Sequence, residues 1–268
     1  MILIKWGGNG SLRVYRLKVT PGKTIRTLPK WLWPPALLYW NVRALALYLL
    51  DSLFQADGSR SSPVNESLSD GVRYVCGADV EGDVAEFGTM SGTTAAILAR
   101  GLSDGGTSKK LLLFDSFQGL PEADSEIDKE SPHVKSGVWS AGTCLVLGPD
   151  ELRSVCAKFL PEDRVVVHEG WFKDTLPRLP DGTKLALLHV DSDLYQSAID
   201  VLDHCFSRKL VQEGAAIFFD DWNCNKASPA FGERRAWSEV VARYGIVCSE
   251  GREYGWAGKK FIVHSYTA

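Results

Sequence analysis

From residue 83 onward, the sequence alternates short apolar runs, rich in Val, Ile, Leu and Phe, with longer amphipathic stretches. This alternation predicts an α/β fold with a doubly wound, mostly parallel sheet, because parallel strands are apolar throughout and helices cover both faces. The expected strands are residues 83–87, 110–115, 164–168, 185–190, 215–220, 245–249 and 260–264. The expected helices are residues 92–101, 149–159, 194–208 and 232–244. The last two strands are too close together for a crossover helix, so one strand near the C-terminus should run antiparallel.

Residues 1–70 lack this alternation, so we expect an N-terminal, mainly helical appendage, with the main domain at residues 71–268. The stretch 56–63 has the composition of a linker. Residues 36–54 are apolar, but Asn41 and Arg43 interrupt them and Asp51 lies near their end. These polar residues favour a buried or interfacial helix over a transmembrane span.

The same appendage carries lysines and arginines but no acidic residue before Asp51. Such a charge run is most often a solvated face or a subunit contact, and weak association with an anionic membrane surface is the alternative. The tryptophan-rich residues 31–40 fit a subunit contact, and therefore a homo-oligomer, or a lid over a substrate.

Length, charge and cysteine content narrow the class of protein. A chain of 268 residues can hold one large domain with an appendage but not two full-sized domains. A formal net charge of -3 gives no reason to expect a nucleic-acid partner, so a small-molecule partner is favoured. The six cysteines include no C-x-x-C pair, and no apolar signal segment opens the chain, which together indicate a cytoplasmic protein.

The first expected strand leads through a glycine-containing turn, residues 86–92, directly into a helix. Glycines allow a ligand to approach the backbone, and a helix N-terminus offers free amides, so a nucleotide-like cofactor fits this turn. Met90 stands where the dinucleotide motif G-x-G-x-x-G has its middle glycine, which argues against NAD. The candidate cofactor-binding residues here are Glu86, Gly88, Thr89, Ser91 and Gly92.

The second strand ends at Asp115 and Ser116, where the carboxylate could accept both hydroxyls of a cofactor ribose. A turn cap by either residue is the alternative. Trp171 and Phe172 follow the third strand and could stack on an adenine ring, although core packing is equally compatible with them. Residues 121–142 have no clear period and are rich in Gly, Pro, Ser, Asp and Glu, so we expect a long loop that covers the site as a lid.

Four aspartates follow the fourth and fifth strands. In the run from His189 to Asp193, a period of two places His189, Asp191 and Asp193 on one face. The fifth strand ends in Asp220 and Asp221. Carboxylates gathered at neighbouring strand ends repel one another unless basic partners or a cation compensate, and all-oxygen ligands favour Mg²⁺, with Mn²⁺ as a substitute. The alternatives are that Asp193 caps the next helix and that His189 is a buried, hydrogen-bonded side chain instead of a ligand.

Several strings in this part of the sequence resemble the macrocin O-methyltransferase family, which methylates sugar hydroxyls of glycosylated natural products. They occur in family order over residues 80–265 and are Val84-Ala85-Glu86-Phe87-Gly88, Phe114-Asp115-Ser116-Phe117-Gln118-Gly119-Leu120-Pro121, Gly170-Trp171-Phe172-Lys173-Asp174-Thr175-Leu176-Pro177, His189-Val190-Asp191-Ser192-Asp193-Leu194-Tyr195 and Asp220-Asp221. The resemblance implies a class I methyltransferase fold with S-adenosylmethionine as methyl donor. It also implies magnesium held by Asp191, Asp220 and Asp221, with Asp193 as general base. Residues 1–70 and the segment 121–142 do not follow the family pattern, so the acceptor stays open.

Methyl transfer from a sulfonium is an in-line displacement, so such an enzyme must hold the acceptor oxygen against the methyl carbon and make it more nucleophilic. A cation beside Asp191 would orient a vicinal diol, while Asp193 would take the proton. A catechol presents the same diol geometry and is a near alternative. A glycosyltransferase that uses Asp191-Ser192-Asp193 as a D-x-D motif is another, but it leaves Asp220 and Asp221 unexplained. A non-catalytic member of the fold is the third.

Overall fold

The computed structural model describes residues 2–6, 12–16 and 62–267. The chain divides into two compact units, Met1–Pro35 and Ala36–Ala268. In the first unit, strands β1 (Ile2–Trp6) and β2 (Leu12–Arg16) pair antiparallel, with Ile2 opposite Arg16. These ten residues are therefore extended and not helical, because aliphatic, β-branched and aromatic residues predominate in both runs. The helix predicted at residues 36–54 and most of the predicted linker lie outside the described residues.

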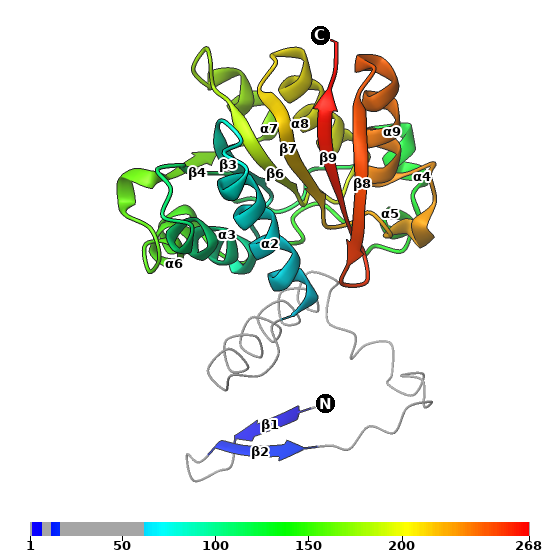
Figure 1. Ribbon diagram of the computed structural model, residues 1–268. Helices are drawn as coiled ribbons and strands as arrows, with labels where there is room; N and C mark the ends of the chain where they lie inside the picture. The colour runs from blue at the N-terminus through cyan, green and yellow to red at the C-terminus, as the bar shows by residue number, and fades with distance from the viewer. Residues whose placement is uncertain (1, 7–11, 17–61, 268) are drawn as a thin grey trace. The chain divides into compact units, whose positions relative to one another are not determined.

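The second unit contains one seven-stranded sheet in the order β5-β4-β3-β6-β7-β9-β8 (Figure 1). Its strands are β3 (Asp83–Phe87), β4 (Leu111–Asp115), β5 (Val165–Glu169), β6 (Leu185–Val190), β7 (Val211–Phe219), β8 (Val247–Tyr254) and β9 (Gly258–Ser265). All neighbours are parallel except that β9 runs antiparallel to both β7 and β8. The short connection between β8 and β9 permits only a hairpin, which confirms the predicted single antiparallel strand.

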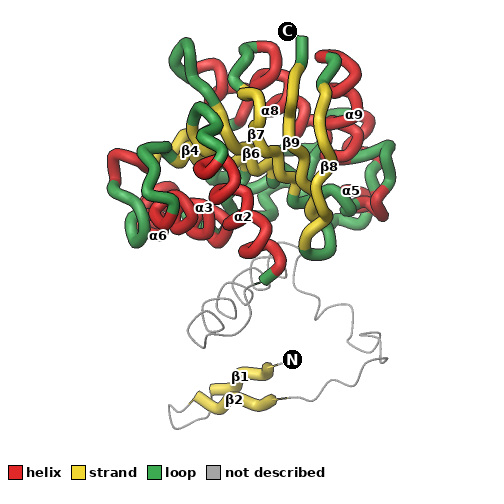
Figure 2. The backbone as a smooth tube through the Cα atoms, in the orientation of Figure 1, coloured by secondary structure: helices red, strands yellow, loops and turns green. Residues whose placement is uncertain are grey.

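Helices cover both faces of this sheet (Figure 2). They are α2 (Pro63–Gly77), α3 (Thr93–Asp104), α4 (Glu126–Glu130), α5 (Pro132–Lys135), α6 (Pro149–Cys156), α7 (Phe172–Thr175), α8 (Tyr195–Ser207) and α9 (Gly232–Tyr244), with the 3-10 turns η2 (Glu162–Arg164), η3 (Leu176–Arg178) and η4 (Asn225–Ala227). None of the helices in the described parts of the chain has the length and apolarity needed to cross a bilayer.

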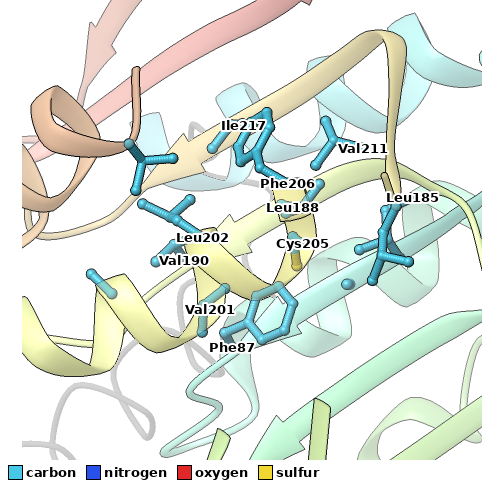
Figure 3. Packing of buried hydrophobic residues seen from close by; sticks show 14 of the residues in the cluster. Phe87, Leu185, Leu188, Val190, Val201, Leu202, Cys205, Phe206, Val211 and Ile217 are labelled. Carbon is cyan, nitrogen blue, oxygen red and sulfur yellow. The ribbon is translucent and has the colours of Figure 1, made fainter. Parts of the chain in front are cut away.

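Alternate strand residues belong to two separate hydrophobic clusters, as the period of two requires. Phe87, Leu188 and Ile217 pack against α8 and α9 in one cluster (Figure 3). Their strand neighbours, such as Leu187 and Phe218, pack against α2, α3 and α6 in the other. The predicted α/β sheet with helices on both faces is therefore confirmed.

Helix α2 crosses the domain boundary that was expected at residue 70. Its Leu68, Val72 and Val75 are fully buried against the sheet, and a Cβ at Gly71 would collide with the ring of Phe218. Ser62 caps the helix by accepting a hydrogen bond from the Asn65 N–H. The packed domain therefore already includes α2, which begins at Pro63 and precedes the α/β alternation on which the expected boundary was based.

The strand order reverses between β3 and β6, since β4 and β5 lie on one side of this pair and β7 on the other. In open α/β sheets, ligands bind at the carboxyl ends of the strands at such a switch point. Gly88 and Asp115 follow β3 and end β4, whereas Asp191 and Asp220 follow β6 and β7. The fold therefore brings both predicted half-sites to one edge of the sheet.

Candidate active site

A cavity of about 770 Å³ opens at this edge. Ten of the residues predicted from the sequence line it, namely Gly88, Thr89, Asp115, Ser116, Trp171, Phe172, Asp191, Asp193, Asp220 and Asp221. Glu86, Ser91 and Gly92 do not. The cofactor candidates and the metal candidates thus share a single cavity, although Gly88 and Asp191 are about a hundred residues apart in the chain.

The carboxylate of Asp115 organises the turn after β3. Its Oδ2 accepts hydrogen bonds from the Thr89 N–H at 2.7 Å and the Thr89 hydroxyl at 2.8 Å. Its Oδ1 accepts from the Phe117 N–H at 2.8 Å. The turn-capping alternative is therefore confirmed, and recognition of a ribose stays a prediction. The two roles are compatible, because Oδ1 accepts the Phe117 N–H alone among the described residues and can accept a second hydrogen bond.

Gly88 brings the cofactor turn against the loop that follows β6. Its φ is +90°, and a Cβ there would collide with the carbonyl oxygen of Asp191. The Asp191 N–H donates to the carbonyl of Phe87 at 2.9 Å, which ties the same two segments together. Only glycine fits this position, since it combines a left-handed backbone with a close approach of two main chains.

Glu86, Ser91 and Gly92 lie outside the cavity and make structural contacts. Glu86 is fully buried on the face covered by α2, α3 and α6, where its Oε1 lies 3.0 Å from His189 Nδ1. Ser91 Oγ lies 3.0 Å from Thr93 Oγ1 at the start of α3. Gly92 is the N-cap of α3 with φ +70°. The motif pattern could not separate these residues from Gly88 and Thr89, because the separation depends on which sheet face each residue occupies.

Three carboxylates converge at the other end of the cavity. One oxygen from each of Asp191, Asp193 and Asp221 lies within 4.8 Å of the others. Burial, followed by the charges of neighbouring aspartates, raises the pKa of Asp191 and of Asp193 well above the usual range. Burial and the charge of Asp220 raise the pKa of Asp221 to about 6. The buried Oδ2 of Asp221 has no hydrogen-bond partner within the described residues. This donor set fits a hard divalent cation.

Asp220 lies beside this group. Its Oδ1 is 3.8 Å from Nε2 of His189, a distance for an ion pair and too long for a hydrogen bond. Burial alone would lower the pKa of His189, but Asp220 and Glu86 outweigh burial and raise it to about 9. His189 is fully buried between Glu86 and Asp220, and the prediction that it is a buried, hydrogen-bonded side chain is confirmed. The assignment of Asp220 as a metal ligand and of Asp193 as general base stays a prediction.

Asp193 does not cap helix α8. Leu194 is the N-cap residue and makes no side-chain cap hydrogen bond. The carboxylate of Asp128 accepts hydrogen bonds from the N–H groups of Tyr195 at 2.8 Å and Gln196 at 3.1 Å, and so caps the helix from a distant segment. Asp193 itself has φ +59°. The capping alternative for Asp193 was wrong because a buried carboxylate distant in the sequence occupies that place.

The predicted lid, residues 121–142, contains α4 and α5 and lines the cavity with several side chains. Asp128 anchors it to α8, and His133 anchors it to Asn225, whose N–H donates to His133 Nδ1 at 3.0 Å. Trp139 is buried next to Leu194 and Ala257 in a small hydrophobic cluster. The lid is thus joined to the segments that follow the aspartates.

Two further cavity residues carried no motif in the sequence. Trp256, in the turn between β8 and β9, lines the cavity and is 75% exposed. Cys224 donates a hydrogen bond from Sγ to Asp221 Oδ1 at 3.1 Å. Neither residue type marks a site by itself, so only the folded hairpin and the short turn after Asp221 reveal their positions.

A buried glutamate joins the two aspartate loops. Glu233, in the first turn of α9, is fully buried. Its Oε1 accepts from the Ser192 N–H at 3.2 Å, and its Oε2 accepts from the Asp221 N–H at 2.9 Å. Burial and the charge of Asp221 raise the pKa of Glu233 well above the usual range. An acidic residue in the first turn of a helix is common for dipole reasons, so the sequence alone did not single it out.

Comparison with known proteins identifies relatives of this domain. The macrocin O-methyltransferase (TylF) family matches residues 64–245. The 8-demethyl-8-(2,3-dimethoxy-alpha-L-rhamnosyl)-tetracenomycin-C 4'-O-methyltransferase of Streptomyces olivaceus is 33% identical over 181 residues, which cover 65% of this chain and 64% of the relative. The demethyldecarbamoylnovobiocin O-methyltransferase of Streptomyces niveus is 33% identical over 180 residues, which cover 66% of each chain. The chain thus spans just under two thirds of the length of these relatives.

Solved structures show the same architecture. The O-methyltransferase NovP has a TM-score of 0.62 and 27% sequence identity, over 76% of this chain and 80% of that one. The calicheamicin methyltransferase CalS11 has a TM-score of 0.60 and 21% identity, over 92% of this chain and 99% of that one. The likeness to CalS11 supports the fold alone. The class I methyltransferase fold implied by the motifs is confirmed.

Proposed function

Because the chain belongs to the macrocin O-methyltransferase family, we propose that it transfers a methyl group from S-adenosylmethionine to a hydroxyl of a glycosylated small molecule, with Mg²⁺ as metal cofactor. One observation carries the proposal. The turn after β3 and the aspartate loop after β6 touch at Gly88 and Asp191 inside one cavity. A methyl donor held by the first would therefore lie next to an acceptor oxygen held by the second.

The proposed donor site uses the turn from Gly88 to Thr89 and the carboxylate of Asp115. The turn is held in place without a ligand by the hydrogen bonds to Asp115. The remaining lone pair on Oδ1 of that carboxylate could accept a ribose hydroxyl. Trp171 and Phe172 line the same region, and the Phe172 ring also packs edge-on against Phe87 at 5.9 Å. Both aromatic side chains would exclude water from the bound donor.

The proposed metal site uses Asp191, Asp220 and Asp221, with Asp193 in the same carboxylate group. When bound, Mg²⁺ would supply Lewis-acid stabilisation of negative charge on the acceptor oxygen. Asp193 would accept the hydroxyl proton, since its carboxylate faces the cavity and is not used in a helix cap. The backbone of β6 and β7 orients these side chains, because Asp191 and Asp220 each donate an N–H to a neighbouring strand.

We propose a sugar hydroxyl as the acceptor because one relative is named for a rhamnosyl tetracenomycin and the other for demethyldecarbamoylnovobiocin. A catechol would present a similar diol and is the second candidate. The glycosyltransferase alternative is less well supported, since it gives no role to the Asp115 turn or to Asp221. We also propose that the enzyme is a homo-oligomer and that it is cytoplasmic. In a reducing compartment its six cysteines would stay unpaired, as they are in the structure.

The test is a methyl-transfer assay with labelled S-adenosylmethionine and acceptors of three kinds, namely a glycosylated polyketide, a glycosylated aminocoumarin and a catechol. We expect turnover of a glycoside that EDTA abolishes and Mg²⁺ restores. Titration calorimetry with S-adenosylhomocysteine and with a UDP-sugar provides the control. Binding of the UDP-sugar without binding of S-adenosylhomocysteine would contradict the proposal and favour a glycosyltransferase.

A further inference from the structure

Glu233 connects the two loops that carry the aspartates. Each of its carboxylate oxygens accepts one backbone N–H, from Ser192 on the β6 side and from Asp221 on the β7 side. Ser192 lies between Asp191 and Asp193 in the chain, so both loops are held at their ligand-bearing residues. One side chain therefore joins both loops next to their aspartates, in addition to the backbone hydrogen bond from the Asp220 N–H to Val190.

This arrangement differs from an ordinary acidic residue at a helix start, which interacts with the free amides of its own helix. Here both oxygens are used on other segments. Gly232, the first residue of α9, has φ +57°, and a Cβ there would lie 3.3 Å from Asn225 Nδ2. This left-handed residue lets the helix begin close to the turn after Asp221, which brings Glu233 into the cluster.

The surroundings of Glu233 are the two aspartate loops. Its two oxygens each accept a backbone N–H from these loops, at Ser192 and at Asp221. The adjacent arginines are engaged elsewhere, since Arg234 donates to Trp222 and Asn223, and Arg235 donates to Glu239 and Ala230. The side-chain hydrogen bonds of Glu233 therefore go to the two aspartate loops, while the cationic side chains of its own helix make their contacts elsewhere.

We propose that Glu233 is a positioning residue for the cation, which fixes the spacing of the two aspartate loops without contacting the ion. This inference rests on the proposed metal-dependent function. Residues behind the direct ligands typically change metal affinity by about 10- to 100-fold when they are substituted. The glutamine variant retains the shape of the side chain, but its amide nitrogen cannot accept from a backbone N–H, so one of the two loops is released.

The test compares Glu233→Gln with Glu239→Gln, a matched change on the same helix. Glu239 accepts from the hydroxyl of Tyr195 and from Arg235, at a partly exposed position away from the aspartate loops. Titration calorimetry measures the affinity of the full-length protein for Mg²⁺ and, separately, for S-adenosylhomocysteine, and thermal unfolding is followed without metal.

We expect Glu233→Gln to weaken Mg²⁺ binding by about 10- to 100-fold, with S-adenosylhomocysteine affinity and metal-free melting temperature near the values of Glu239→Gln. Equal Mg²⁺ affinity in both variants would overturn the inference. So would a parallel loss of both affinities together with a lower melting temperature, since that indicates a purely structural role. If wild-type protein binds S-adenosylhomocysteine but no divalent cation, both the metal part of the proposed function and this inference are wrong. Unchanged binding in the variant alone rejects only the inference.

Discussion

The two ends of the active-site cavity differ in what compensates the negative charge of their acidic side chains. At the cofactor end, both oxygens of Asp115 accept hydrogen bonds from Thr89 and Phe117 of the chain itself. At the other end, Asp191, Asp193 and Asp221 gather within 4.8 Å, and no Lys or Arg in the described parts of the chain forms an ion pair with them. The cofactor end is therefore preformed, whereas the carboxylate end holds an excess of negative charge that a bound cation would relieve.

Removing one charge from the carboxylate end gives the largest expected effect. Asp221→Asn should lower turnover by roughly 10³-fold, because several kcal/mol of charge stabilisation depend on the cation site. The same change should raise the melting temperature of the metal-free protein by about 2–4 °C, corresponding to ~1 kcal/mol of relieved repulsion. Single-turnover methyl transfer and differential scanning calorimetry measure the two quantities. A lower metal-free melting temperature would mean that the three aspartates are not a repulsive group.

The variant Asp193→Asn tests whether Asp193 acts as the general base or as a metal ligand. If Asp193 takes the proton, we expect turnover to fall by about 10²-fold or more, while Mg²⁺ and S-adenosylhomocysteine bind with unchanged affinity. The measurement is kcat with saturating substrates, together with calorimetric titration of both ligands. Turnover at the wild-type rate with normal binding of both ligands would show that the assignment is wrong. Loss of Mg²⁺ binding would instead make Asp193 a ligand.

The variant Asp115→Asn tests the cofactor end of the cavity, which is preformed by hydrogen bonds within the chain. An amide nitrogen cannot accept from the Thr89 or Phe117 N–H, so one of these hydrogen bonds is lost and the turn is released. We expect S-adenosylhomocysteine to bind about 10-fold more weakly, which corresponds to the loss of ~1–1.5 kcal/mol. Mg²⁺ affinity should stay the same, because the carboxylate group at the other end is untouched. A decrease in Mg²⁺ affinity of the same size would show that the two ends are not independent.

Trp256→Ala should have the smallest effect, since this side chain lies at the rim and is 75% exposed. An exposed tryptophan beside a cavity is suited to stack on a sugar or an aromatic ring, at about 0.5–1.5 kcal/mol. We expect KM for the acceptor to rise about 2- to 13-fold, with kcat and the affinities for Mg²⁺ and S-adenosylhomocysteine unchanged. Steady-state kinetics with varied acceptor concentration measures this. An unchanged KM would mean that the acceptor does not reach the β8–β9 turn.

The strongest periodic elements could be predicted closely from the sequence. Strand β6 and helix α9 have the predicted bounds, Leu185–Val190 and Gly232–Tyr244, because their apolar patterns are uninterrupted. Strand β7 begins at Val211 instead of residue 215, since the polar residues Gln212 and Glu213 and then Gly214 hide its first half. The lid contains two short helices that begin after Ser125 and Ser131, and these were too short to produce a helical period.

The local sequence pattern by itself places Asp115, Asp191 and Asp220 at one edge of the sheet. Each ends or follows a predicted parallel strand, and the carboxyl ends of parallel strands lie at the same edge. Only the tertiary structure decided which residues face the cavity and which do not. Glu86 faces the opposite side and pairs with His189, Asp128 replaces Asp193 as the cap of α8, and Glu233 crosses from α9 to hold both loops. Each of these facts is a contact between residues at least a dozen positions apart. Local pattern and propensity contain no information on such contacts, because they arise only when the layers of the fold pack together.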